Sequence, residues 1–211
     1  RTGERLWHFQ MVHHDLWDYD AAAAPQLVTV RHGGREVDAV AVATKHGFLF
    51  AFHRVTAQPL WPIEERPVPP SDVPGEQAWP TQPFPTVLPP FARQRMTPGD
   101  VTPYGLNETE RAEWRARIEE LEQAGRTGLF TPLSHERETL AVPGAVGGAS
   151  WGNTAANPRT GMVYVYSIGW PSFYPVLEKR EVAAGPAGGA GAGGARPGAP
   201  PAKPGAPGGE L

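Results

Sequence analysis

Residues 26–52, QLVTVRHGGREVDAVAVATKHGFLFAF, contain three short apolar runs separated by two turns that hold glycine. The runs QLVTV (26–30), VDAVAVAT (37–44) and FLFAF (48–52) are rich in the β-branched and aromatic residues typical of strands. The turns fall at residues 32–34 (HGG) and 45–47 (KHG), and connections this short cannot hold the crossover that parallel neighbours need. The stretch therefore predicts an antiparallel three-stranded meander and an all-β fold.

Composition excludes several classes of function. The 211 residues carry a formal net charge of -3, with Arg and Lys scattered among acids, which argues against a nucleic-acid partner. No apolar run approaches the roughly 18 to 20 residues that cross a bilayer, so no membrane segment is predicted in this chain. Cysteine is absent, which excludes disulfides, thiolate catalysis and covalent haem attachment through Cys within the chain.

The two ends of the chain differ in character. The start, RTGERLW (1–7), has no initiator Met and no targeting pattern and reads as a turn leading into a strand, so we interpret the sequence as a fragment. Residues 182–211 hold 10 Gly, 9 Ala and 6 Pro and offer almost nothing to fill a core. We expect a folded unit over residues 1–181 and a disordered Gly/Ala/Pro-rich tail over residues 182–211.

A weak repeat indicates how the strands are organised. A turn followed by an apolar or aromatic strand recurs in RTGERLW (1–7), RVTAQPLW (54–61) and PRTGMVYV (158–165). Trp7 and Trp61 lie 54 positions apart, a spacing that suits one propeller blade with an insertion. The alternative is that turn chemistry recurs by chance in any β-rich chain.

Two segments interrupt the strand pattern. Residues 58–105 are dense in proline, which removes ladder donors, so we expect an ordered loop packed over a surface. Residues 107–125 predict an inserted helix with a capping pair, an apolar stripe, an exposed ion pair and a terminal glycine. These features are, in order, Asn107 with Glu110; Trp114, Ile118 and Leu121; Glu113 with Arg117; and Gly125.

The segment HFQMVHHDLWDYD (8–20) holds the candidate chemistry. It follows an expected strand, where loops commonly carry sites, and its acids Asp15, Asp18 and Asp20 alternate with aromatic residues. Asp15 and Asp18 could supply oxygen ligands to a hard cation. Equally, Asp15 could cap a turn while the histidines and aromatics are packed in the core. The local pattern leaves both interpretations open.

Three blocks resemble one family. WHFQMVHHDLWDYD (7–20), ATKHGFLFAFHRVTAQPLWPIEERPVPPSDVPGEQAWPTQPFP (43–85) and GGASWGNTAANPRTGMVYV (147–165) resemble the pyrroloquinoline quinone (PQQ)-dependent dehydrogenases. The resemblance covers about residues 1–170, and the His-His-Asp form is most similar to the membrane-bound glucose dehydrogenase branch. It implies part of an eight-bladed β-propeller, about three to four blades, from a periplasmic enzyme that oxidises alcohols, sugars or polyols.

The resemblance also implies roles for individual residues. Asp18 matches the catalytic carboxylate, which takes the substrate hydroxyl proton and contacts a bound Ca²⁺. Lys45 matches the cationic residue that hydrogen-bonds the reactive quinone oxygens. Trp151 and Asn153 fall in a block that approaches the quinone, although Ser150 stands where the family often has Asn, which departs from the pattern. The implied cofactors are PQQ and Ca²⁺, and the implied electron acceptor is ubiquinone or a cytochrome c.

Two hypotheses other than an enzyme remain open. A non-enzymatic propeller scaffold would share the blade repeat without needing Asp18 and Lys45, and a degenerate remnant would no longer form the propeller. If the enzyme reading holds, we expect the chain by itself to bind the cofactor poorly and to be inactive, because an open set of blades exposes sheet edges.

Overall fold

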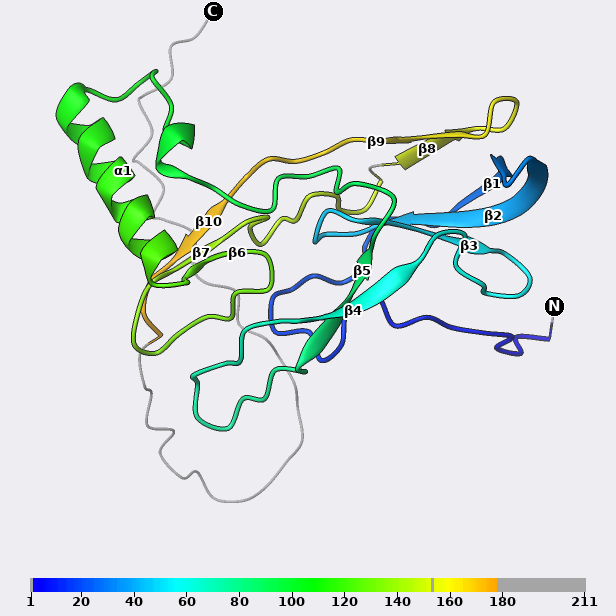
Figure 1. The fold of residues 1–211 in the computed structure, drawn as a ribbon, viewed down its shortest axis with the longest axis horizontal. Coiled ribbons are helices and arrows are strands. Elements are labelled where there is room, and N and C mark those ends of the chain that lie inside the picture. The colour runs from blue at the N-terminus through cyan, green and yellow to red at the C-terminus, as the bar shows by residue number, and fades with distance from the viewer. Residues whose placement is uncertain (1, 153, 178–211) are drawn as a thin grey trace, which may run out of the picture. The chain divides into compact units, whose positions relative to one another are not determined.

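A computed structural model describes residues 2–152 and 154–177 of the chain (Figure 1). The regular elements among these residues are mostly short β-strands, with one α-helix and one 3₁₀ helix. In chain order the elements are β1 Gln26–His32, β2 Arg35–Ala43, β3 Leu49–His53, β4 Ile63–Pro67, β5 Thr81–Pro85, η1 Pro98–Asp100, α1 Glu108–Gln123, β6 Thr127–Gly128, β7 Thr139–Ala141, β8 Thr154–Asn157, β9 Met162–Val165 and β10 Ser172–Tyr174. Within the described ranges no helix has the length and apolarity that a bilayer crossing requires.

The predicted meander is confirmed. β1, β2 and β3 form an antiparallel sheet in that order, with Val30 opposite Val37 and Ala41 opposite Ala51. Its buried face supplies the largest core cluster, which brings together residues from both strands and loops. The members of this cluster are Val12, Tyr19, Val40, Val42, Phe48, Phe50, Phe52 and Phe130.

The strand expected at the start of the chain is absent. No strand is assigned to the described residues before Gln26, although Trp7 and Phe9 still pack on the meander, with ring centroids 6.0 and 4.8 Å from Phe52. A strand needs a hydrogen-bonded neighbour, and the described residues provide none here. Aromatic packing and a hydrogen bond from the Trp7 indole N–H to the Arg54 carbonyl, at 3.1 Å, fix this segment against the end of β3.

The proline-rich segment is more regular than predicted. The expected loop over residues 58–105 contains an antiparallel ribbon of β4 and β5, in which Glu65 lies opposite Pro83, and the short helix η1. In a two-stranded ribbon each strand has one free edge, so prolines whose missing N–H faces outward do not interrupt pairing. The expectation of an ordered loop was therefore wrong for residues 63–67 and 81–85.

The predicted helix is present as α1. Asn107 accepts a hydrogen bond from the Glu110 N–H at 2.9 Å, and the Glu110 carboxylate accepts from the Asn107 N–H at 2.8 Å, which completes the capping box. Ile118 is buried against β7 residues. The expected pair of Glu113 with Arg117 was wrong.

A tertiary contact explains the different pairing. Arg117 bonds to both carboxylate oxygens of Glu138, and its guanidinium lies 5.1 Å from the Trp114 ring and 5.0 Å from the Phe173 ring. A bidentate, stacked site is more favourable for arginine than an exposed i, i+4 pair on one helix.

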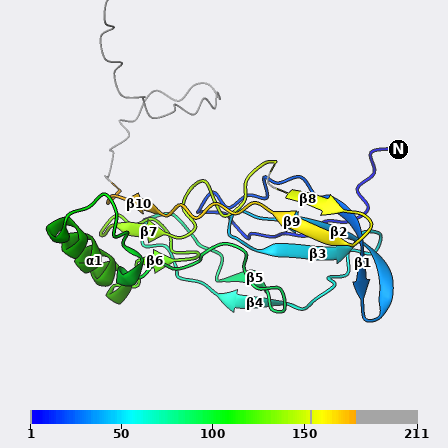
Figure 2. The same ribbon diagram turned by 90° about the horizontal axis from the view of Figure 1, so that it is seen from above.

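The remaining strands form small separate sheets. β6 pairs in parallel with β7, which pairs antiparallel with β10, and β8 pairs with β9. The β8–β9 hairpin lies beside β1 (Figure 2), where the Gln26 amide donates to Thr154 Oγ1 at 3.0 Å. A propeller blade has four strands, and no sheet in the described residues has that number. The number of blades and the closure of a ring stay predictions.

Candidate active site

Asp18 projects from a segment whose neighbours are anchored in the core. Tyr19 is 1% exposed and donates a hydrogen bond to the Pro143 carbonyl at 2.6 Å, and Trp17 meets Phe130 edge to face at 5.0 Å. Burial raises the pKa of the Tyr19 hydroxyl, so it remains a donor. The Asp18 side chain is 69% exposed, and its backbone is left-handed with φ +61°. The alternation of acids and aromatics thus separates a solvent-facing side from a core-facing side.

The residues just before Asp18 are held by polar contacts. Asp15 accepts from the Trp17 N–H at 2.9 Å, an Asx turn, so the capping interpretation of Asp15 is confirmed. The buried Gln82 amide bridges the backbone N–H and C=O of His13 at 2.8 and 2.7 Å. The His13 ring bonds to Glu65 at 3.0 Å. These contacts fix the approach of the chain to Asp18.

Lys45 lies on the turn between β2 and β3, and bonds within the turn and to two separate segments hold it. Thr44 bonds to Phe48 within the turn, where Gly47 has φ +84°. The Phe91 N–H donates to the Gly47 carbonyl at 2.9 Å, and the Gly148 N–H donates to the Lys45 carbonyl at 2.6 Å. A turn fixed by independent partners presents its side chain in one direction, as a preorganised site requires.

The structure brings Asp18 and Lys45 together. Lys45 Nζ lies 3.0 Å from Asp18 Oδ2 and 2.6 Å from Asp20 Oδ1, and the lysine side chain is only 12% exposed. Burial alone would lower the pKa of Lys45, but the hydrogen bonds to Asp20 and Asp18 outweigh it and the pKa is raised. The ammonium therefore stays protonated at neutral pH.

Sequence reasoning gave no role to Asp20, although a usable signal was present. Side chains two residues apart in an extended segment point to the same side. Asp18 and Asp20 flank the buried Tyr19, and both carboxylates contact the Lys45 ammonium. The pattern of two acids around an aromatic could have predicted a shared partner.

A buried histidine lies behind Lys45. His46 is fully buried and touches the rings of Tyr19, Phe48, Phe50 and Phe130. Burial lowers the pKa of His46 to about 3, so the ring is neutral at physiological pH. It contributes apolar volume beneath the turn and no second charge to the site.

A glycine-containing loop covers the stem of Lys45. A Cβ on Gly147, where φ is +79°, would lie 2.5 Å from Cβ and Cγ of Lys45 and 2.7 Å from its Cα. Only glycine allows the backbone to approach the lysine this closely. Residues 144–148 therefore form one wall of the site.

Trp151 and Asn153 are the two other predicted contact residues. Trp151 is 80% exposed and lies three positions after Gly148, on the turn before β8. It is on the same loop that covers Lys45, and its ring remains free to meet a ligand or another segment. Asn153 lies outside the described residues.

The donors around Lys45 fit a ligand oxygen. An ammonium has three N–H donors, and the contacts with Asp18 and Asp20 use two of them, which leaves one. The two carboxylates offer oxygens to a hard cation, but calcium takes about six to eight. In the part of the chain that the structure describes, no three His, Cys, Asp or Glu side chains gather as a metal site would require. The residues fit a quinone oxygen, and only partly fit a cation.

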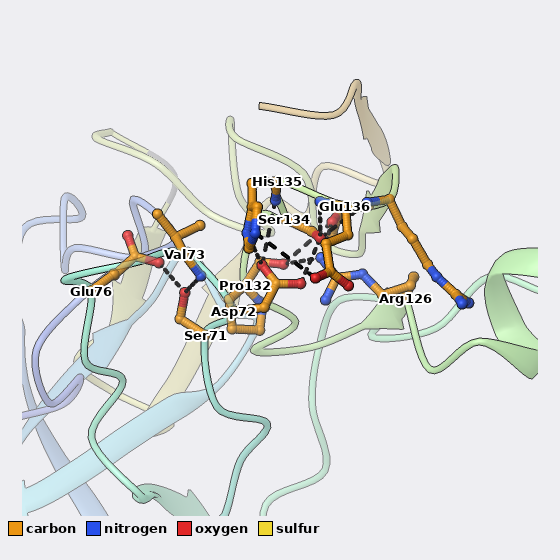
Figure 3. Close-up of polar contacts among 11 residues, drawn as sticks. Ser71, Asp72, Val73, Glu76, Arg126, Pro132, Ser134, His135 and Glu136 are labelled. Carbon is orange, nitrogen blue, oxygen red and sulfur yellow. Dashed lines mark hydrogen bonds and ion pairs between the residues drawn. The ribbon is translucent and has the colours of Figure 1, made fainter. Parts of the chain in front are cut away.

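A second polar cluster joins the proline-rich segment to residues 126–139 (Figure 3). Ser134 donates to Asp72 at 2.6 Å, and His135 Nδ1 lies 3.4 Å from the same carboxylate. Burial would raise the pKa of Asp72, but the bonds from Ser134 and His135 outweigh it and lower the pKa. The Ser134 hydroxyl bonds to the acid rather than to the histidine, so this is a structural clasp and not a nucleophile with its base.

The chain is similar to known proteins over most of its length. The family model of the PQQ glucose/ethanol/alcohol dehydrogenase β-propeller domain matches residues 1–206. The glycerol dehydrogenase large subunit of Gluconobacter oxydans (strain 621H) is 33% identical over 165 residues, which are 77% of this chain and 22% of that protein. Quinoprotein glucose dehydrogenase A of Acinetobacter calcoaceticus is 34% identical over 176 residues, 81% of this chain and 21% of that protein.

A third relative has a different substrate in its name. The probable quinate dehydrogenase (quinone) of Xanthomonas campestris pv. juglandis is 30% identical over 188 residues, 87% of this chain and 23% of that protein. The chain thus spans only between a fifth and a quarter of the length of these curated relatives.

Proposed function

This chain belongs to the PQQ-dependent glucose/ethanol/alcohol dehydrogenase β-propeller family, and on that premise we propose that the protein oxidises a hydroxyl group of an alcohol, sugar or polyol. The observation that carries the proposal is the 3.0 Å contact between Lys45 Nζ and Asp18 Oδ2, made by residues 27 positions apart. A buried cation and an exposed carboxylate in one cluster provide a donor and an acceptor of protons side by side.

Asp18 acts as the general base. Its exposed carboxylate accepts the proton of the substrate hydroxyl, and the left-handed backbone at this position directs the oxygen away from the core. When Asp18 bonds to the substrate it gives up part of its contact with Lys45. Positioned base catalysis of this kind contributes about 100- to 10,000-fold in rate.

Lys45 stabilises negative charge on the hydride acceptor. PQQ, when bound, supplies the electron sink that takes the hydride. When the cofactor is bound, the ammonium would have its remaining N–H to offer to a quinone oxygen, and because the stem is enclosed by Gly147 it would need little reorganisation as charge develops. Trp151 and Asn153 are proposed as further contacts to the cofactor.

Asp18 would also supply one oxygen ligand to a Ca²⁺ ion, if the protein binds one. The described residues contribute too few ligands to complete such a site, so the other oxygens come from elsewhere in the protein or from the cofactor. The full-length gene product, stripped with a chelator, is expected to lose activity and to regain it when Ca²⁺ is added back.

The substrate class, location and electron acceptor are proposed from the relatives. Glycerol, glucose and quinate dehydrogenases among them support a polyol, sugar or cyclic alcohol as substrate. We propose a periplasmic location, with ubiquinone or a cytochrome c as the electron acceptor.

The test is the substitution Asp18→Asn in the full-length gene product, supplied with PQQ and Ca²⁺ and assayed by dye reduction with glycerol, glucose and quinate. We expect a loss of kcat of at least about 100-fold. The matched control is Asp38→Asn, an exposed acid that pairs with Arg54 at 2.5 Å on the meander and should keep full activity. Wild-type protein that reduces no dye would favour a scaffold if it folds and a degenerate remnant if it does not.

A further inference from the structure

We propose that Asp20 is a positioning residue that fixes the Lys45 ammonium, so that Asp18 is free to exchange its own contact for one with the substrate. The inference rests on the proposed function of Lys45. It gives different tasks to two carboxylates that the sequence presents as equivalent.

The distances separate the two acids. Lys45 Nζ lies 2.6 Å from Asp20 Oδ1 but 3.0 Å from Asp18 Oδ2. A charge-assisted N–H···O bond is typically about 2.7 to 2.9 Å long, so the contact with Asp20 is the tighter one. Asp20 is also the less exposed of the two, at 58% against 69% for Asp18.

The backbone supports Asp20 more firmly. The Asp20 carbonyl accepts from the Ala22 N–H at 3.0 Å, and Tyr19 immediately before it is locked by its bond to Pro143. Asp18, by contrast, lies at a left-handed position whose side chain is directed outward. The chain therefore holds Asp20 against the lysine and leaves Asp18 at the mouth of the site.

The ammonium has enough donors for both acids and a ligand. Its three N–H donors serve Asp20, Asp18 and one ligand oxygen. If Asp18 turns to the substrate, a lysine held by Asp18 alone would lose its orientation. With Asp20 in place, one strong bond remains and the stem stays enclosed by Gly147 and Gly148.

The ordinary alternative is a surface ion pair with little effect. Exposed pairs contribute about 0 to 1 kcal/mol and often do nothing measurable. The lysine here is only 12% exposed, however, so its ammonium has few other positions to occupy. Because the lysine is enclosed, losing Asp20 should leave the Lys45 ammonium misoriented.

The experiment compares Asp20→Ala and Asp20→Asn in the full-length gene product with PQQ and Ca²⁺. Asp20→Ala should lower kcat at least tenfold and leave KM for the substrate within twofold, because the defect concerns the acceptor side of the reaction. Asp20→Asn keeps an oxygen acceptor for the ammonium and should recover at least half of the lost rate. Asp38→Ala, which removes an acid from an exposed pair on the meander, is the matched control and should leave kcat unchanged.

A double-mutant comparison separates this inference from the proposed function. Lys45→Ala should lower kcat strongly, and Asp20→Ala should have no further effect in that background. If Lys45→Ala keeps full activity, the proposed function of Lys45 fails. If Lys45→Ala is inactive but Asp20→Ala matches wild type, only the role of Asp20 is overturned. An Asp20→Ala variant whose sole defect is a higher Ca²⁺ requirement would assign the residue to cation binding and also overturn it.

Discussion

Replacing Gly147 with alanine tests whether the close approach of the glycine-containing loop to Lys45 shapes the site. The new methyl group would lie 2.5 Å from Cβ and Cγ of Lys45, well inside normal contact distance, and the lysine backbone cannot retreat freely because Gly148 holds its carbonyl at 2.6 Å. The substitution should displace the lysine stem and with it the ammonium.

The magnitude has two parts. A left-handed backbone at φ +79° costs alanine about 1 to 2 kcal/mol. Overpacking against fixed neighbours costs about 1 to 3 kcal/mol more. We therefore expect Gly147→Ala to lower the free energy of unfolding by about 2 to 5 kcal/mol.

Gly105→Ala is the matched control. Gly105 has a similar φ of +75°, but nothing lies within 4 Å of where its Cβ would be, so only the backbone part applies. Urea unfolding of both variants measures the difference, which should be about 1 to 3 kcal/mol. Dye reduction by the full-length gene product should fall for Gly147→Ala and not for Gly105→Ala. Equal stability of the two variants, or full activity of Gly147→Ala, would refute the account of this wall.

Three further predictions concern the framework of the site. Burial lowers the pKa of His46 to about 3, so below pH 6.5 the unfolded state binds a proton that the folded state does not. The free energy of unfolding should therefore fall as the pH decreases from 6.5, by about 2 kcal/mol at pH 5. Urea midpoints of wild type and His46→Gln will test whether this ring is responsible. Gln82→Leu leaves the backbone N–H and C=O of His13 without their partner and should cost about 2 to 4 kcal/mol in the same assay. Asn107→Ala removes the cap of α1 and should cost about 1 kcal/mol, while kcat of the full-length gene product stays unchanged.

The meander and the helix could be predicted because local sequence determines both. Strand runs, glycine turns and a capping pair act over a few residues, and the structure has β1–β3 and α1 where those signals lie. The contact of Asp18 with Lys45 was anticipated through family resemblance, since no periodicity relates residues 27 positions apart.

The errors arise where distant segments decide the outcome. The start of the chain has strand-like residues, but among the described residues no strand pairs with its backbone. The ribbon of β4 and β5 was not predicted because a high density of proline indicates a loop. Prolines on the free edge of a two-stranded ribbon are nevertheless tolerated. Arg117 pairs with Glu138 and stacks on two aromatic rings instead of pairing with Glu113 on the same helix. Only the tertiary structure brings Glu138 and these rings close to Arg117.

The bond from Tyr19 to Pro143 joins residues 124 positions apart and has a consequence for the order of folding. The β1–β3 meander forms from local contacts, but the anchor of Tyr19 beside Asp18 and the loop of residues 144–148 over Lys45 both need residues near the far end of the described chain. Long-range closure of this kind is slow compared with turn and hairpin formation. On a ribosome, which releases the N-terminal part first, Lys45 would remain uncovered until residues 144–148 have been synthesised.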